Sequence, residues 1–384
     1  MAGEKVRLGV IGVGGMGAGH CVNAKKLEEV QLTAVADIDA ARAKEIGEQY
    51  GVPYFERHRD MLAQDMVDAV VIATPHYFHP PIAIDAFEAG LHVLSEKPIG
   101  VSVSMAERMI EAAEKSGKVF AVMFQMRTEP AVRKARELVE AGELGETRRT
   151  LLISPEFRSQ AYYDSGGWRA TWKGEGGGPL MNQGPHIMDM FTLLGGMPSR
   201  VTGWTKTLIH DIEVEDHAEA TLEYPNGATG YVYISTCEVR PGQLIEIVGD
   251  KGKLRYVDGE MHLYRNQPPV SEFNRTNTEP WGTPKVVEVE LELPESESGH
   301  GAVLRNFARA ILYGEELISP GADGIKSLEL ANAIMLSSHK GEPVDIPVDR
   351  QEFDDLIDHL RSTSTFKKKR VKPKRQMDPR LKGK

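Results

Sequence analysis

The most constraining feature of this chain is a strict alternation of strand-like and helix-like segments over its first 127 residues. Short apolar runs rich in Val and Ile are separated by stretches with helical spacing, and the connections between them are short. This order predicts a parallel sheet wrapped by helices on both faces. The five expected strands are residues 6–13, 31–39, 68–75, 92–98 and 119–127.

The pattern changes after a predicted helix at residues 130–145. Later runs alternate apolar and polar residues, and turns such as Pro225-Asn226-Gly227 separate several of them, which predicts an antiparallel or mixed sheet. Because 384 residues exceed one ordinary core, we expect two domains. The predicted fold is α/β, with a parallel-sheet domain at residues 1–127, an α+β domain with a large open sheet at 128–348, and an extension at 349–384.

The net charge of −10 is unevenly distributed along the chain. Residues 367–384 hold ten Lys or Arg and one Asp, a net +9, so the remainder carries −19. An acidic body argues against nucleic acid as the main partner. The basic tail lacks apolar periodicity and is expected to be a solvated end. Contact with an acidic neighbouring subunit or with RNA is the alternative.

Simple patterns also argue against several other classes of protein. No run of about 18 apolar residues is present, so we expect no membrane span. The N-terminal residues enter a strand-like run at once, which leaves no room for a signal sequence. The two cysteines, Cys21 and Cys237, offer neither a disulfide framework nor metal-ligand spacing, which predicts a reducing, cytoplasmic setting.

A glycine-rich turn joins the first expected strand to the helix that follows. Gly12, Gly14 and Gly17 form a G-x-G-x-x-G pattern in this context, which is typical of a loop that holds a dinucleotide pyrophosphate at a helix N-terminus. Asp37 ends the second strand, where a carboxylate accepts hydrogen bonds from ribose hydroxyls and repels a 2′-phosphate. This favours NAD over NADP, although the nearby Arg42 keeps NADP as the less favoured alternative.

Two further strand ends should meet at the same edge of the sheet, where ligands bind. The third strand ends in ATPHYFH, which places Thr74 and Pro75 at that edge, followed by His76 and His79. Each histidine alone is more typical of a core or capping residue, and no metal site is expected, because no carboxylate or cysteine accompanies them at ligand spacing. The fourth strand ends in LSEKPIG. Pro98 restricts the backbone there, so the amine of Lys97 is held where it can exchange a proton with a substrate hydroxyl.

A second polar constellation lies in GEGGGPLMNQGPHIMDM of the second domain. Asn182, His186 and Asp189 recur at spacings of four and three, so they are predicted to share one face of a helix. Such a face suits either a site wall or a capped, buried helix. Histidine is the side chain best suited to proton transfer near neutral pH, whereas asparagine positions hydroxyls and is not a base.

Taken together, these stretches resemble the glucose–fructose oxidoreductase, inositol dehydrogenase and rhizopine-catabolism (Gfo/Idh/MocA) family over residues 5–348. The resemblance implies an N-terminal Rossmann domain, a C-terminal α/β domain whose open sheet pairs with another subunit's, and NAD(P)-dependent chemistry on a sugar, glycoside or cyclitol. Lys97 and His186 match the family's catalytic lysine and histidine. Asn182 departs from the commoner aspartate, which leaves His186 as the base.

The same resemblance implies the remaining site residues. Trp168 and Arg169 are similar to a pair that reaches the nicotinamide end in some members, with an ordinary turn as the alternative. Asn182, Arg127, Trp172 and Asp189 are predicted to bind substrate. The predicted cofactor contacts are Gly12, Gly14, Gly15, Met16, Gly17, Asp37, Thr74, Pro75, His76, His79, Glu96, Lys97, Gln125, Trp168 and Arg169.

The prediction from the sequence is an NAD-dependent dehydrogenase that acts on a secondary hydroxyl, with C3 of a sugar ring favoured, and that forms a homodimer or homotetramer through the C-terminal sheet. An alternative is a glycosidase that retains NAD and cleaves by transient C3 oxidation, elimination and re-reduction. Trp168 and Trp172 suit stacking on such a larger glycoside. A second alternative is a dinucleotide-binding protein without catalytic activity.

Overall fold

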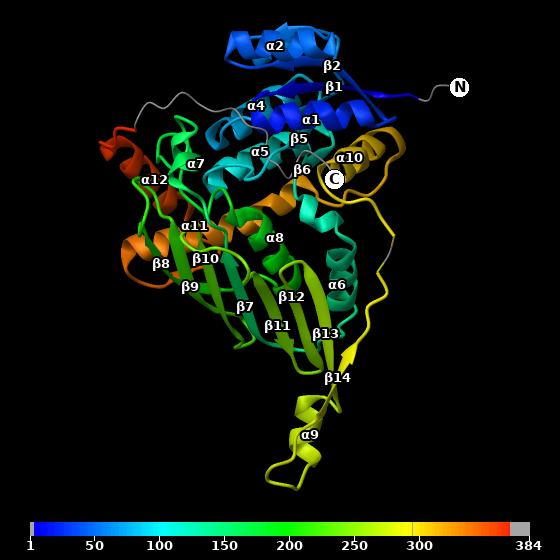
Figure 1. The fold of residues 1–384 in the computed structure, drawn as a ribbon, viewed down its shortest axis with the longest axis vertical. Coiled ribbons are helices and arrows are strands. Elements are labelled where there is room, and N and C mark those ends of the chain that lie inside the picture. The colour runs from blue at the N-terminus through cyan, green and yellow to red at the C-terminus, as the bar shows by residue number, and fades with distance from the viewer. Residues whose placement is uncertain (1–3, 294, 369–384) are drawn as a thin grey trace.

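The computed structural model describes residues 4–293 and 295–368. Its N-terminal part is a six-stranded parallel sheet in the order β3-β2-β1-β4-β5-β6 (Figure 1). This confirms the predicted parallel sheet and adds β3, whose two residues are too short a run to recognise in the sequence. The strands are β1 (Val6–Ile11), β2 (Val30–Ala36), β3 (Tyr54–Phe55), β4 (Ala69–Ile72), β5 (His92–Ser95) and β6 (Phe120–Val122). The helices between them are α1 (Gly15–Lys26), α2 (Ala40–Tyr50), α3 (His58–Leu62), α4 (His79–Glu88) and α5 (Val103–Ser116).

Successive residues of the central strand β4 bury their side chains on opposite faces of this sheet. Val71 packs in the cluster that contains Cys21 of α1, whereas Ile72 packs in the cluster that contains Ile82 of α4. A continuous apolar run is what a strand covered on both faces requires. All strands of this sheet run parallel, so the loops that follow them emerge together at one edge.

The second part of the chain forms a nine-stranded mixed sheet in the order β14-β13-β12-β11-β7-β10-β9-β8-β15. β7 and β10 run parallel, and the other neighbours are antiparallel. The strands are β7 (Thr147–Pro155), β8 (Arg200–Lys206), β9 (His217–Glu223), β10 (Thr229–Ser235), β11 (Leu244–Gly249), β12 (Gly252–Val257), β13 (Glu260–Gln267), β14 (Lys285–Val289) and β15 (Val344–Asp345).

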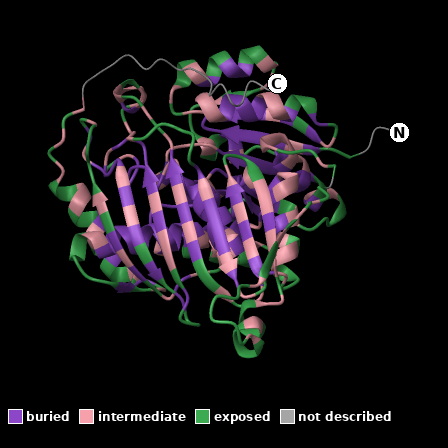
Figure 2. Ribbon diagram, turned by 60° about the horizontal axis from the view of Figure 1, so that its bottom comes forward, coloured by how far each residue is buried: buried purple, intermediate pink, exposed green. Residues whose placement is uncertain are grey.

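Helices cover one face of this second sheet, as α8 packs on β7 and α11 packs on β8. Figure 2 looks at the other face, where the strands alternate buried and partly exposed residues and no described helix crosses them. The helices of this part are α6 (Pro130–Glu140), α7 (Gln160–Asp164), α8 (Gly184–Gly195), α9 (Val270–Thr276), α10 (His300–Tyr313), α11 (Gly324–Lys340) and α12 (Arg350–Thr363).

The two sheets are held together by segments that cross between them. Helix α10 packs against α1, so Phe307 belongs to a core cluster of the first sheet although it follows the second sheet in sequence. Asn332 of α11 accepts from the Val103 amide at 3.1 Å and donates to the Val101 carbonyl at 3.1 Å. The loop between β5 and α5, at the carboxyl edge of the first sheet, is therefore bound directly to α11 of the second part.

No described helix is long and apolar enough to cross a membrane. The basic tail predicted to be a solvated end lies mostly outside the described residues, which stop at Lys368.

Candidate active site

The glycine loop between β1 and α1 has the geometry that a bound pyrophosphate needs. Gly12 adopts φ +85°, and a Cβ there would lie 2.7 Å from the Ala73 carbonyl oxygen. A Cβ on Gly17 would lie 1.8 Å from the Gly12 carbonyl oxygen, so only glycine lets α1 approach the turn. A Cβ on Gly14 would meet nothing within 4 Å. The loop thus leaves open space above Gly14 and directs the N-terminus of α1 into it, as a phosphate site requires.

Asp37 at the end of β2 is tied to this loop. Its carboxylate accepts from the Val13 amide at 2.9 Å and from the Asp39 amide at 2.9 Å. The Arg42 Nε donates to the Val13 carbonyl at 2.7 Å, and its guanidinium lies 2.9 Å from the Glu45 carboxylate. Arg42 therefore braces the loop and has its charge matched by Glu45, whereas Asp37 presents a carboxylate at the predicted ribose position.

The loops after β4 and β5 are joined by His79. One ring nitrogen bonds the Thr74 carbonyl at 2.6 Å and the other bonds the Pro98 carbonyl at 2.7 Å. His76, also buried, bonds the Glu175 carbonyl at 3.1 Å and meets the Trp168 ring edge-on at 5.6 Å. Both histidines thus fix loops of the candidate site, and their predicted contact with cofactor stays a prediction.

Glu96 pairs with a histidine that the sequence did not single out. The His20 ring on α1 lies 2.8 Å from the Glu96 carboxylate, and both side chains are buried. Burial alone raises the pKa of Glu96, but the His20 hydrogen bond and charge outweigh it and lower that pKa to about 2. The carboxylate of the E-K-P stretch is therefore ionised and anchored to the helix that starts at the glycine loop.

Lys97 reaches across the interface to the second part of the chain. Its Nζ donates to the main-chain carbonyl of Asn182 at 2.8 Å, and the Lys97–Pro98 peptide bond is cis. His186, on the first turn of α8, lies 3.4 Å from the Gln125 amide nitrogen and packs edge-on against Phe124. The structure thus brings Lys97, in the loop after β5, and His186 of α8 to the carboxyl edge of the parallel sheet.

The predicted helical face of Asn182, His186 and Asp189 is only partly correct. Helix α8 begins at Gly184, so Asn182 lies in the turn before it. The Asn182 Nδ2 donates to the Glu175 carboxylate, which also accepts from the Ala170 amide. Sequence reasoning missed Glu175. The available signal was a single carboxylate enclosed by glycines in GEGGG, a position with little other side-chain chemistry.

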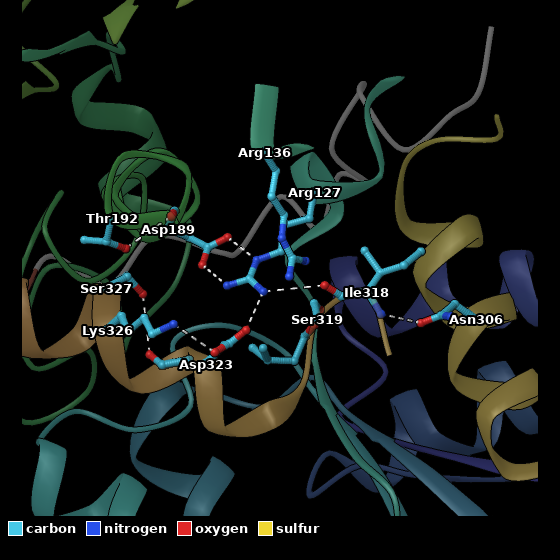
Figure 3. Close-up of polar contacts among 12 residues, drawn as sticks. Arg127, Arg136, Asp189, Thr192, Asn306, Ile318, Ser319, Asp323, Lys326 and Ser327 are labelled. Carbon is cyan, nitrogen blue, oxygen red and sulfur yellow. Dashed lines mark hydrogen bonds and ion pairs between the residues drawn. The ribbon is translucent and has the colours of Figure 1, made fainter. Parts of the chain in front are cut away.

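Arg127 and Asp189 form a buried ion pair (Figure 3). The Arg127 Nε and one terminal nitrogen donate to the two Asp189 oxygens at 2.8 and 2.6 Å, and the other terminal nitrogen lies 2.7 Å from Asp323. Arg127 is 4% and Asp189 1% exposed. Each group thus satisfies the charge of the other inside the protein, and the predicted substrate contacts of these two residues stay predictions. The pair joins the 3-10 helix η2 (Gln125–Thr128) to α8.

The two tryptophans near the site, Trp168 and Trp172, have different surroundings. The Arg169 guanidinium lies over the rings of Trp168 and Tyr162, 4.7 and 4.5 Å from their centres, and its predicted contact at the nicotinamide end stays a prediction. Trp172 is 9% exposed and packs edge-on against His339 of α11. The ring is thus buried against a helix of the second part, and its predicted contact with substrate stays a prediction.

One other cluster has ligand-type side chains. His210, Asp216 and Cys237 have candidate ligand atoms within 4.8 Å of one another. The two His210 nitrogens already bond Asp216 at 2.9 Å and the Arg158 carbonyl at 2.7 Å. The Asp216 carboxylate also accepts three backbone amides, from Leu208, Ile209 and His210. Hydrogen bonds thus account for the cluster.

The chemistry of the donor set fits a nicotinamide dinucleotide. The open space above Gly14 suits the pyrophosphate, Asp37 carries a carboxylate at the end of β2, and Lys97 and His186 are side chains able to donate and accept a proton at the same edge of the sheet. A parallel-sheet domain with this glycine turn, paired with a second domain that contributes a histidine, defines a dinucleotide-dependent oxidoreductase.

Family models match both parts of the chain. The model described as the oxidoreductase family with an NAD-binding Rossmann fold matches residues 6–124, and that of the GFO/IDH/MocA C-terminal domain matches residues 132–255. The chain therefore belongs to the GFO/IDH/MocA oxidoreductase family, which confirms the predicted family and its enzymatic character.

Individual relatives support the same placement. The uncharacterized oxidoreductase YrbE of Bacillus subtilis is 26% identical over 352 residues, 89% of this chain and 97% of the relative. Inositol 2-dehydrogenase of Corynebacterium glutamicum is 40% identical over 147 residues, 37% of this chain and 43% of the relative. D-xylose 1-dehydrogenase (NADP(+)) 2 of Haloferax volcanii is 27% identical over 339 residues, 88% of this chain and 99% of the relative.

A solved structure is similar over nearly the whole chain. It is the WlbA dehydrogenase from Bordetella pertussis in complex with NADH and UDP-GlcNAcA. The TM-score is 0.76 at 28% identity, and the match covers 90% of this chain and 100% of that chain.

Proposed function

We propose that this protein is an NAD-dependent dehydrogenase that interconverts a secondary hydroxyl and a ketone on a sugar, glycoside or cyclitol, with C3 of a sugar ring favoured. The observation that carries the proposal is the 2.8 Å bond from Lys97 to Asn182, which holds an ammonium at the cofactor edge opposite the helix that bears His186. The relatives named as inositol and xylose dehydrogenases support the substrate class.

The two polar residues divide the proton chemistry between them. His186 takes the hydroxyl proton, and Lys97 donates a hydrogen bond to the developing alkoxide, which stabilises the charge that appears on oxygen. Bound NAD⁺ supplies the hydride acceptor, so that a ketone and NADH are formed. The Asn182 amide, half-buried beside Lys97, orients a neighbouring hydroxyl.

The preference for NAD is part of the proposal. Asp37 directs a carboxylate to the ribose position and disfavours a 2′-phosphate, while the charge of Arg42 is matched by Glu45. An NADP-dependent relative in the family makes a direct comparison of the two cofactors necessary.

We also propose that the uncovered face of the nine-stranded sheet is the contact between subunits of a homodimer or homotetramer. Trp204 on β8 is 45% exposed, and this is a large apolar side chain to leave in water. Native mass spectrometry of the purified protein counts the subunits and shows whether NAD remains bound. A monomer at micromolar concentration would contradict this part.

The activity is tested with NAD⁺ and a panel of sugars, glycosides and inositols, with absorbance of NADH as the readout. We expect turnover with at least one polyol and a loss of about 10²–10⁴-fold in kcat for His186→Ala. The exposed Arg136→Ala on α6 is the control and should retain activity. Release of an aglycone from an aryl glycoside without net NADH would instead indicate the NAD-retaining glycosidase. NAD binding without any turnover would indicate a non-catalytic protein.

A further inference from the structure

Glu175 is a buried carboxylate placed directly beside the proposed substrate site. It is 1% exposed and lies between Gly174 and Gly176 in the segment that leads to α8. One carboxylate oxygen accepts from the Asn182 Nδ2, and the other accepts from the Ala170 amide. Both oxygens thus have a donor, which is the condition for keeping a carboxylate inside a protein.

Cations and hydrogen-bond donors around Glu175 reduce the free-energy cost of burying its carboxyl group. Burial is the largest influence and raises the pKa of Glu175 above its usual value, and the Arg169 charge, the two hydrogen bonds and the Lys368 charge offset only part of that rise. Lys368 itself donates to the carbonyls of Gly166 and Arg169, so its ammonium stays close to this loop. Cations at two positions around the buried carboxyl thus reduce the cost of its burial.

The hydrogen bonds of the Glu175 carboxyl show which way the Asn182 amide faces. One Glu175 oxygen accepts from the Ala170 amide and the other accepts from Asn182, so the carboxyl faces the NH₂ group of the Asn182 amide. The amide oxygen then lies on the opposite side of the Asn182 Cγ, turned away from Glu175. The main-chain carbonyl of the same residue accepts from Lys97 at 2.8 Å. Asn182 is therefore fixed at two atoms, one bound to the proposed catalytic lysine and one bound to Glu175.

We infer that Glu175 is a positioning residue, which holds the Asn182 amide oxygen toward the substrate so that it accepts from a hydroxyl adjacent to the one that reacts. This inference rests on the proposed function and makes it narrower. Lys97 contacts both the main-chain carbonyl of Asn182 and the reacting hydroxyl. The side-chain amide oxygen of Asn182 is the next acceptor on the same residue, so it meets the hydroxyl on the neighbouring ring carbon. The substrate class is then a vicinal diol rather than any secondary alcohol.

The hydrogen bond between Glu175 and Asn182 predicts what happens when the carboxyl and the amide are exchanged between the two positions. In Glu175→Gln the new amide cannot accept from both Ala170 and Asn182 as the carboxylate does. In Asn182→Asp two carboxylates face each other in a buried site. In the variant that carries both substitutions, the introduced amide accepts from Ala170 and donates to the introduced carboxylate, which keeps an acceptor oxygen toward the substrate. Each single variant should lower Tm by about 3 °C or more, and the double variant should recover most of the loss.

Kinetics test the orientation itself. Glu175→Gln should raise KM for a vicinal diol about tenfold while kcat changes less than about threefold, because one ground-state hydrogen bond is lost. The double variant should return KM to within about threefold of the wild type. For a substrate that lacks the adjacent hydroxyl, the wild type and Glu175→Gln should have equal KM. The matched control is Glu213→Gln, a nearby carboxylate that bonds the Trp172 amide at 2.7 Å.

Two results would overturn the inference. Losses in Tm that simply add in the double variant would show that positions 175 and 182 are not paired. An unchanged KM in Glu175→Gln, with the pairing intact in Tm, would show that Glu175 does not act on substrate. If the wild type turns over no polyol, the proposed dehydrogenase fails and the substrate contact fails with it, while the Tm cycle, measured without substrate, still decides the pairing.

Discussion

The ammonium of Lys97, at the end of β5, donates a 2.8 Å hydrogen bond to the main-chain carbonyl of Asn182, in the turn before α8. This contact joins the parallel-sheet part of the chain to the mixed-sheet part at the edge where the glycine loop opens. A residue on each side of the interface is thus needed to place one functional group, so the site exists only when both parts are assembled.

Replacing Lys97 tests whether its role is chemical. Lys97→Met keeps a similar length but removes the donor, so kcat should fall about 10²–10⁴-fold, because the developing alkoxide loses its stabilising hydrogen bond. Because Lys97 is also a predicted cofactor contact, the affinity for NADH is measured by fluorescence titration alongside, which separates a loss of cofactor binding from a loss of kcat. A variant with unchanged kcat would show that Lys97 only braces the interface.

The Arg127–Asp189 pair predicts a large effect on stability. Arg127→Met leaves the Asp189 carboxylate buried without its bidentate partner, which should lower the free energy of unfolding by about 3–5 kcal/mol. Urea unfolding monitored by circular dichroism measures this value. Arg136→Ala removes an exposed pair with Glu140 and should change stability by less than about 1 kcal/mol. Similar small losses in both variants would contradict the structural role of Arg127.

The sequence could predict those features whose cause is local. The glycine turn follows from a steric need at Gly12 and Gly17, and Lys97 follows from its place at a strand end. Helix α12 also has a local signal, with Asp349 as its N-cap and apolar Phe353 and Ile357 four residues apart, although it falls within the predicted extension at residues 349–384.

Features that depend on long-range contacts could not be predicted in this way. Arg127 and Asp189 are 62 residues apart, and both residue types are ordinary choices for a substrate site. Only the packing of η2 on α8 shows that each satisfies the other. The roles of Glu175 and Trp172 likewise depend on segments that meet only in the folded chain.

Cofactor choice can be tested at the end of β2. Asp37→Ser removes the carboxylate, so KM for NAD⁺ should rise about tenfold, and the preference for NAD⁺ over NADP⁺ should fall by a similar factor. Because Asp37 also accepts from the Val13 amide, Tm of the variant must be measured alongside. An unchanged ratio of kcat/KM for the two cofactors would mean that Asp37 does not bind the ribose hydroxyls.

The last prediction concerns the dependence of stability on pH. Glu215 contacts the segment that leads to α8. One of its carboxyl oxygens accepts from the Gly178 amide at 2.8 Å and from the Leu180 amide at 3.2 Å. Its other oxygen is buried and has no hydrogen-bond partner among the described residues. Burial raises the pKa of this carboxyl from 4.5 to about 7, against the pull of the backbone hydrogen bonds and with a further contribution from the Glu175 charge.

Because the pKa of Glu215 is raised in the folded state, the direction in which stability changes with pH is determined. Between pH 4.5 and about 7 the unfolded chain releases the Glu215 proton while the folded chain keeps it, so the stability contributed by this group is lost as pH rises. The loss across this window is on the order of 3 kcal/mol. In Glu215→Gln the amide oxygen still accepts from the two backbone amides, and its buried NH₂ costs a constant amount. Urea unfolding at pH 5 and pH 8 should therefore show a smaller decline for this variant than for the wild type. The Glu213→Gln control should follow the wild type, and parallel curves for Glu215→Gln would contradict the assignment.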